Sequence, residues 1–383
     1  MRPVTTFVRH NGIKALLAAE KGIRAASGGR LCNNLFDTQP RYVGSSVRVL
    51  KETDDMTYIA KYGADGKISD GEFKILVTTD LHLWDEKPLI EKSLQMLARH
   101  AAAEKPDLIL FTGDVVLTDF QQIDAIQFAQ FMEKMGIYWA IVFGNHEARE
   151  EKEFHKYFML KNIVDFPHCL SKFGDEKLFG YGNFAINIMN ADNTIRQSIF
   201  MFDSGRDTNE KYFAEHNVPA GTSSYDFLKN NQINWYKNSI KKLEAEHGKF
   251  KSMMLMHIPL CEYKEVMEQD ENGDYVPTGK AEILYGGMYE SVGCSSFNSG
   301  MFDAVLELGS TQAIFAGHDH INDFCAKYKG VYLVYAQCNG YNTYTMGSNY
   351  GWDEKDWMQG VTMVDLQGDG SLSFRQRFNR DYL

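Results

Sequence analysis

The sequence predicts an α/β protein whose sheet is buried on both faces. Short, nearly continuous apolar segments of strand length occur at residues 73–77, 108–111, 138–143, 199–202, 253–256, 313–316 and 331–335. Between the early segments, Ile90, Leu94, Leu97 and Ala101 recur at helical spacing, and residues 124–135 have the composition of a helix. Apolar strands that alternate with helices are typical of a sheet that helices cover on both sides.

Composition and charge limit the class of protein. The chain has 383 residues, of which 44% are hydrophobic and 24% are charged, as in folded globular proteins. Its 40 Lys and Arg residues are outnumbered by 51 Asp and Glu residues, which gives a net charge of −11. Because nucleic acids and anionic membranes bind cationic surfaces, we expect neither a nucleic-acid polymer nor a membrane as a partner. A small anionic substrate is still compatible with this charge, since a bound metal ion inverts the local field.

The sequence contains no segment that predicts export or a membrane span. No apolar run approaches the roughly 18 residues of a membrane helix, and the basic N-terminus lacks an apolar signal core. The six cysteines are scattered and form no C-x-x-C pair, so we expect reduced, mostly buried thiols. Cys261 and Cys294, in polar sequence, are the expected exceptions. These observations predict a cytoplasmic protein.

The chain divides into two parts of different character. Residues 1–71 form an N-terminal extension packed on the main domain, with a helix predicted over 14–25 and short strands over 47–50 and 57–62. Residues 72–383 contain no internal repeat or linker and are predicted to form one domain. Within it, residues 205–225 and 261–300 are polar and Gly-rich and predict long loops.

Polar residues follow five of the predicted strands at the point where each strand ends. In chain order these groups are Asp80-Leu81-His82, Gly113-Asp114, Gly144-Asn145-His146-Glu147, His257 and Gly317-His318-Asp319-His320. In open α/β sheets, ligands bind in the crevice beyond the carboxyl ends of the strands. We therefore expect all five groups to point at one site.

The residue types in these groups suit metal ions. Imidazole and carboxylate ligands without thiolates favour Mn, Fe, Zn or Ni. A single Asp after a strand is usually a helix cap, and a single His is usually structural. Here, however, five of the 11 histidines fall in the five groups, in order and in matching context. The combination predicts a metal centre.

The five groups, read as D-x-H, G-D, G-N-H-[DE], H and G-H-x-H, resemble the calcineurin-like metallophosphoesterase superfamily. The resemblance spans residues 72–383 and identifies them as a catalytic domain. It implies a four-layer α/β/β/α sandwich with two mixed β-sheets. It also implies two divalent or mixed-valence transition-metal ions, Mn, Fe or Zn, in the site.

The resemblance assigns a role to each site residue. Asp80, His82 and His320 would hold the first metal. Asn145, His257 and His318 would hold the second, and Asp114 would bridge both. His146 and Asp114 would be the catalytic residues, with His146 as the acid that protonates the leaving group.

The implied function is a dinuclear-metal-dependent phosphoesterase whose partner is a small phosphoester. It would hydrolyse phosphomonoesters or small phosphodiesters by attack of a hydroxide that bridges the metals. One alternative is a cyclic-nucleotide or other nucleotide phosphodiesterase. Another is a binding module that keeps the fold but is catalytically silent. An amidohydrolase is disfavoured, because its H-x-H pair comes early in the chain, whereas residues 318–320 come late.

A closer resemblance links the C-terminal half to the plant and fungal purple-acid-phosphatase-like group. The matching segments are residues 257–262, 298–302, 317–324 and 340–341. The G-D block contains no Tyr, so we expect no iron–tyrosinate centre. Leu117 and Thr118 stand where protein phosphatases have Asp and Arg, so a protein phosphatase is disfavoured. Asp119 could orient His146 and Arg149 could bind phosphate, although each also fits a surface ion pair.

The two predicted loops carry many aromatic residues. They are Tyr212, Phe213, Tyr225, Tyr263, Tyr275, Tyr285 and Tyr289. These side chains fit two interpretations. They could stack on an aryl or nucleobase group at the site, or they could pack on the edge of the sheet.

Overall fold

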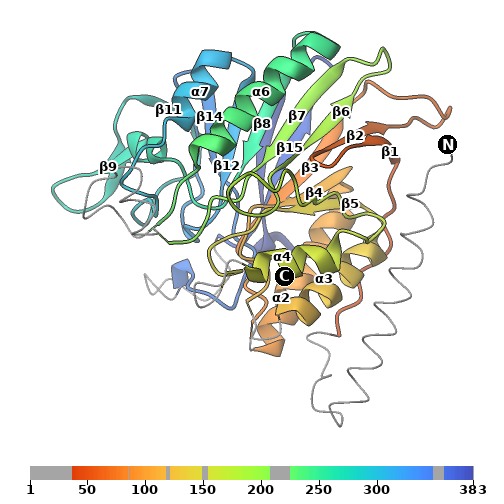
Figure 1. The fold of residues 1–383 in the computed structure, drawn as a ribbon. Coiled ribbons are helices and arrows are strands. Elements are labelled where there is room, and N and C mark those ends of the chain that lie inside the picture. Colours follow the sequence, from red (N-terminus) through yellow and green to blue (C-terminus); the bar gives the residue numbers. More distant parts are fainter. Residues whose placement is uncertain are drawn as a thin grey trace.

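Two β-sheets pack face to face, and helices cover the outer face of each sheet (Figure 1). The computed structural model describes residues 37–84, 86–117, 121–148, 154–207, 225–347 and 358–382. The result is a four-layer α/β/β/α arrangement with two mixed sheets, as the sequence predicted. The predicted helix over 14–25 lies outside the described residues.

The smaller sheet has five strands and carries the first three strand–loop groups. In spatial order its strands are β16 (Leu372–Phe378), β15 (Gly360–Leu366), β3 (Phe73–Thr78), β4 (Leu108–Phe111) and β5 (Tyr138–Ile141). β3, β4 and β5 are parallel, so their carboxyl ends lie at one edge. Its outer face is covered by α2 (Lys87–Glu104), α3 (Gln121–Met135) and α4 (Phe154–Ile163) (Figure 1).

The larger sheet has nine strands and carries the other two groups. In spatial order they are β1 (Val47–Glu52), β2 (Met56–Lys61), β6 (Phe184–Met189), β7 (Ile195–Met201), β8 (Lys251–Leu255), β12 (Thr311–Ala316), β14 (Val331–Tyr335), β13 (Cys325–Tyr328) and β11 (Ala281–Tyr285). β7, β8, β12 and β14 run parallel. α6 (Asn230–His247) and α7 (Met301–Leu308) pack on its outer face (Figure 1).

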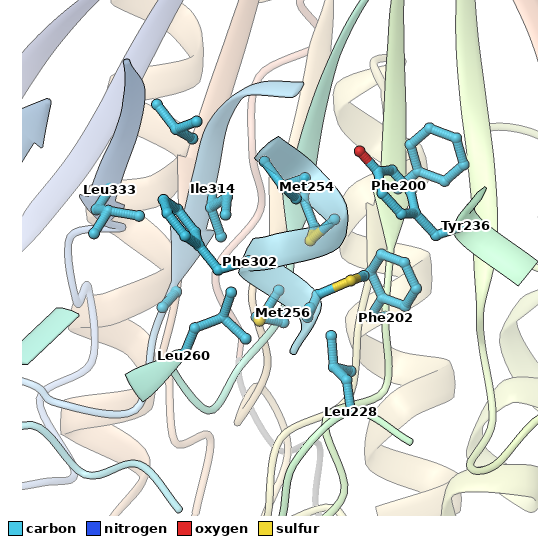
Figure 2. Packing of buried hydrophobic residues seen from close by; sticks show 14 of the residues in the cluster. Phe200, Phe202, Leu228, Tyr236, Met254, Met256, Leu260, Phe302, Ile314 and Leu333 are labelled. Atoms are coloured by element: carbon cyan, nitrogen blue, oxygen red, sulfur yellow. The ribbon is translucent and has the colours of Figure 1, made fainter. Parts of the chain in front are cut away.

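Three hydrophobic clusters fill the spaces between the four layers, and the alternation of side chains along each strand explains them. In β8, Met253 and Leu255 lie in the cluster between the sheets, whereas Met254 lies in the cluster under α6 and α7. Figure 2 shows this outer cluster, in which Met254 packs near Phe200 and Tyr236. Because both faces of the central strands are buried, their sequences read as continuous apolar runs.

Two predicted strands in the N-terminal part are confirmed as β1 and β2. They form the edge of the nine-stranded sheet, since β2 pairs with β6 in parallel. The division at residue 71 stays a prediction.

The prediction of one long loop over residues 261–300 was wrong. This segment contains η2 (Cys261–Glu265), β9 (Met267–Gln269), β10 (Tyr275–Pro277) and the edge strand β11. β11 is a partly exposed edge strand that carries Glu282, so its sequence lacks the continuous apolar run of a buried strand. Of the other predicted loop, residues 208–224 lie outside the described part.

The described cysteines are free thiols, namely Cys169, Cys261, Cys294, Cys325 and Cys338. Cys261 is partly exposed as expected, but Cys294 is buried, contrary to the prediction. Within the ranges that the structure describes, no helix has both the length and the apolar character needed to cross a bilayer.

Candidate metal centre

The structure brings together every residue predicted to hold a metal. Two groups of possible ligand atoms occur among the described residues, and within each group the atoms all lie within 4.8 Å of one another. The first group is Asp80, His82 and His320, and the second is Asp114, His257 and His318. Both draw on loops from both sheets, because residues 80–82 and 114 follow β3 and β4, whereas residues 257 and 318–320 follow β8 and β12.

In the first group, two imidazole nitrogens and a carboxylate oxygen converge. His82 Nε2 and His320 Nε2 lie 3.2 Å apart, at 3.4 and 3.3 Å from Asp80 Oδ1. Burial alone would raise the pKa of Asp80, but His320 and His257 hold it well below the usual range of a carboxyl. A permanently ionised carboxylate beside two histidines is a suitable ligand set for a transition metal.

A hydrogen bond to the backbone orients the ring of His257. Its Nδ1 lies 2.8 Å from the Thr112 carbonyl oxygen, which can only accept, so Nδ1 carries the proton. Its Nε2 faces Asp114 Oδ2 at 3.1 Å and Asn145 Oδ1 at 2.9 Å. Burial alone would lower the pKa of His257, but Asp114 and Asp80 raise it to about 10, so these atoms favour a positive charge between them, either a proton on Nε2 or a bound metal ion. The Nδ1–H to carbonyl bond is also the usual way in which a metal-binding His is oriented.

Both aspartates use one oxygen for the scaffold and leave the other for a metal. The backbone N–H of His318 donates to Asp80 Oδ2, and that of His146 donates to Asp114 Oδ1, each at 2.9 Å. Asp114 Oδ2 is buried and accepts no hydrogen bond within the described part of the chain. An orphaned buried carboxylate oxygen at this position fits a metal-bridging role, so the residues present fit two metal ions.

Four of these residues have an unusual backbone conformation. Asp80, His82, Asp114 and His318 have φ of 52°, 44°, 52° and 75°, in the left-handed region that L side chains rarely adopt. Such strain persists where the surrounding structure imposes it, and it concentrates at functional sites. Gly144 is required for a related reason, because a Cβ there would lie 2.1 Å from Asp114 Oδ1.

Glu147 lies beneath the site and joins two of its loops. The fully buried carboxylate accepts backbone N–H groups of Asp114 at 3.1 Å and of Val115 and Gly144 at 2.6 Å. Burial and the neighbouring Asp114 raise its pKa to about 8. The acidic residue of the G-N-H-[DE] block was noted from the sequence, but this clamping role was not predicted.

A network around His320 was also missed by sequence reasoning. Thr343 Oγ1 lies 2.6 Å from His320 Nδ1, and the ring of Tyr344 stacks on the imidazole with centroids 4.2 Å apart. The Tyr344 hydroxyl donates to Glu290 Oε2 at 2.7 Å, and Glu290 Oε1 accepts the backbone N–H of Ile321 at 2.9 Å. These residues orient His320 from segments distant in sequence, where no motif marks them.

His146 is placed at the open side of the site. Its side chain is 53% exposed, and its Nε2 lies 3.9 Å from Asp114 Oδ2. Partial burial lowers its pKa, against the opposing effect of Asp114. Asp119 and Arg149, the residues considered as its partner and as a phosphate ligand, lie outside the described residues.

Known proteins of similar sequence include plant and yeast phosphatase relatives. "Probable inactive purple acid phosphatase 14" of Arabidopsis thaliana is 29% identical over 336 residues, covering 78% of this chain and 76% of that protein. "Phosphatase DCR2" of Saccharomyces cerevisiae is 29% identical over 287 residues, covering 67% of this chain and 46% of the yeast protein. A solved dimetal phosphatase from Danio rerio has a TM-score of 0.46 at 13% identity, covering 80% of this chain and 96% of that one. The predicted resemblance to purple-acid-phosphatase-like proteins is confirmed.

The family model described as "Calcineurin-like phosphoesterase" matches residues 73–322, more than half of the chain. The matched region contains all seven predicted metal ligands and the strands that carry them. The chain belongs to the calcineurin-like phosphoesterase family.

Proposed function

We propose that this protein is a dinuclear-metal-dependent phosphoesterase that hydrolyses phosphomonoesters or small phosphodiesters. The observation that carries the proposal is the pair of ligand groups at the carboxyl ends of the strands, with the orphaned Asp114 Oδ2 beside the second group. Asp80, His82 and His320 would hold one ion, and Asn145, His257 and His318 the other, with Asp114 as the bridge. Manganese, iron and zinc all suit these ligands.

The chemistry divides between the ions and the protein. Two bound ions would supply Lewis-acid stabilisation and an activated water. The exposed imidazole of His146 is positioned to give a proton to the leaving alkoxide, and its lowered pKa makes its protonated form a stronger acid. Glu147 fixes the two loops that carry Asp114 and Asn145, so the site is organised before substrate binds.

The name of the plant relative raises the alternative of a silent binding module. "Probable inactive" is said of that protein, and the yeast relative is named a phosphatase. In this chain every ligand position is filled, and His146 is present and accessible. These features support catalysis here rather than a fold that only binds.

A nucleotide phosphodiesterase is the second candidate function. Two aromatic rings border the ligand groups, because Tyr225 packs against His318 with centroids 4.4 Å apart and Tyr344 stacks on His320. Aromatic rings beside a phosphate site can stack on a nucleobase.

Cytoplasmic location is part of the proposal, supported by the free thiols of the described cysteines.

A turnover screen tests the proposal. Protein loaded with Mn²⁺ is assayed against aryl phosphomonoesters, bis-aryl phosphodiesters and cyclic nucleotides. We expect hydrolysis of at least one class, and the preferred class separates the two candidate functions. Metal-loaded protein that hydrolyses none of them would contradict the proposal and favour the silent module.

A further inference from the structure

A pocket of about 460 Å³ lies beside the second ligand group. It is lined mainly by η2, β9 and the segment before α7, through Lys264, Met267, Met288, Val292 and Gly293, with Tyr225 on one side. This volume is within the roughly 300–1,000 Å³ usual for small-molecule sites.

The pocket shares a wall with the candidate metal centre. The ring of Tyr225 packs edge-on against His318, with centroids 4.4 Å apart, and also lines the pocket. Gly293 lines it too, and a Cβ there would lie 2.7 Å from His318 Cδ2. The Gly293 N–H is fixed by Asp319, whose two carboxylate oxygens both lie 3.1 Å away. Tyr225 and Gly293 therefore lie between a group bound in the pocket and His318, a candidate metal ligand.

The lining has an apolar wall, some uncharged polar groups and a single charge. Met267 and Met288 are each only 7% exposed and Val292 6%, so their side chains form a packed apolar wall. Methionine side chains are polarizable and adapt to aromatic groups. Among the described residues that line the pocket, Lys264 is the one charged side chain.

Lys264 stands on a rigid element, and its acidic neighbours are already engaged. The preceding Tyr263 is fully buried and donates to the Ile314 carbonyl at 2.8 Å, which fixes η2 on the sheet. Glu265 pairs with Lys280 at 2.6 Å, and Glu262 accepts from Asn298 Nδ2 at 2.7 Å. The Lys264 ammonium interacts with the thiol of Cys294, which also lines the pocket, so its positive charge is held at the pocket wall, where it can meet an anionic ligand.

We propose that this pocket binds the organic group of the phosphoester, and that it selects an aromatic or apolar group that carries an anionic substituent facing Lys264. This inference rests on the proposed phosphoesterase function, since the phosphoryl group would occupy the adjacent metal centre. The apolar wall binds the body of the organic group. The lysine distinguishes acids from their neutral derivatives.

Binding of non-hydrolysable analogues tests the proposal without turnover. Phenylphosphonate, 4-(2-carboxyethyl)phenylphosphonate and the methyl ester of the latter carboxyl are titrated into Mn²⁺-loaded protein by calorimetry. We expect the acid to bind about tenfold more tightly than its methyl ester, a typical gain for one charge-assisted contact. Lys264→Gln should abolish this ratio, and Lys264→Glu should invert it. Lys249→Gln, at an exposed lysine of another surface, is the matched control and should keep the ratio.

The outcomes distinguish failure of the pocket proposal from failure of the phosphoesterase proposal. Wild-type protein that binds phenylphosphonate but does not distinguish acid from ester would overturn the subsite and leave the phosphoesterase proposal intact. An acid preference that survives in Lys264→Glu would also overturn it. Metal-loaded protein that binds no phosphonate at all would overturn both proposals.

Discussion

The two sheets contribute different chemistry to the same site. Loops of the five-stranded sheet carry the candidate oxygen ligands, Asp80, Asp114 and Asn145, with one histidine, His82. Loops of the nine-stranded sheet supply only imidazoles, from His257 and from the segment 318–320.

Each ligand group combines both sources. His320 joins the first group from the larger sheet, and Asp114 joins the second from the smaller one. Each candidate metal site therefore draws on both sheets, and bound metals would link the two halves of the fold.

The largest effect is expected at Asp114, the residue that would serve both metals. Asp114→Asn removes the charge from the bridging oxygen while keeping the side-chain shape. We expect loss of both metals and a fall in kcat/KM of at least about 10³-fold, measured by metal analysis and aryl phosphate turnover. Asp54→Asn, at an exposed carboxylate, is the control. A fully active, metal-loaded Asp114→Asn protein would overturn the bridging role.

Separate removal of one histidine from each sheet tests whether the two groups are independent. His82→Ala belongs to the first group and His257→Ala to the second. Each variant should retain about one metal per chain and lose roughly 10²-fold or more in turnover, since both ions stabilise the same transition state. Metal analysis by mass spectrometry provides the count. Loss of both metals from each variant would mean that the groups form a single cooperative unit.

His146 belongs to the five-stranded side but does not bind metal in this account. His146→Ala should keep both metals and lose about 10²–10⁴-fold in kcat on an alkyl phosphate, whose leaving group needs a proton. The loss on 4-nitrophenyl phosphate should be much smaller, because nitrophenolate leaves without protonation. Equal losses on both substrates would remove the acid assignment.

Removal of the metals tests the link between the sheets. A bound ligand at about 100 times its Kd stabilises the folded state by about 2.7 kcal/mol, which corresponds to several degrees in Tm. We therefore expect chelation to lower the melting temperature, and Mn²⁺ to restore it. An unchanged melting curve after verified metal loss would show that the sheets associate without help from the site.

The smallest effect concerns the outer face of the five-stranded sheet. His100 of α2 is fully buried, donates from Nε2 to Asn379 Oδ1 at 2.8 Å, and has a pKa lowered by burial. Its neutral form is stabilised by folding, so its contribution is present above about pH 6.5 and declines as pH falls through its lowered pKa. His100→Gln should flatten the pH dependence of the unfolding free energy between pH 7 and pH 5, by less than about 1.4 kcal/mol per pH unit. Denaturant titrations at both values measure it, and an unchanged slope would contradict the assignment.

The central strands and the ligand positions were predictable from the sequence because local signals specify both. β3, β4 and β12 are apolar on both faces, and the polar residues after them mark the strand ends. β6 escaped prediction partly because Asn187 interrupts its apolar run. That residue is buried and accepts a hydrogen bond from Ser198 Oγ of β7 at 2.7 Å, a contact that only the paired strands reveal.

The surroundings of the site were not predictable from the sequence, because no local signal marks the residues that form them. Glu290, Thr343 and Tyr344 reach His320 only after separate segments of the chain have packed together. Polar residues in irregular segments have no periodicity, so their positions depend on tertiary contacts rather than on local pattern. The pocket beside His318 is likewise built from η2, β9 and the segment that ends at Cys294.

The most direct test of the account is to measure metal content and hydrolysis on one preparation of the wild-type protein. After incubation with Mn²⁺ and removal of excess ion, we expect two metals per chain and hydrolysis of an aryl phosphoester. We expect both quantities to fall together on chelation. Two tightly bound metals without hydrolysis of any ester in the panel would contradict the catalytic claim, and a protein that binds no metal would contradict the site itself.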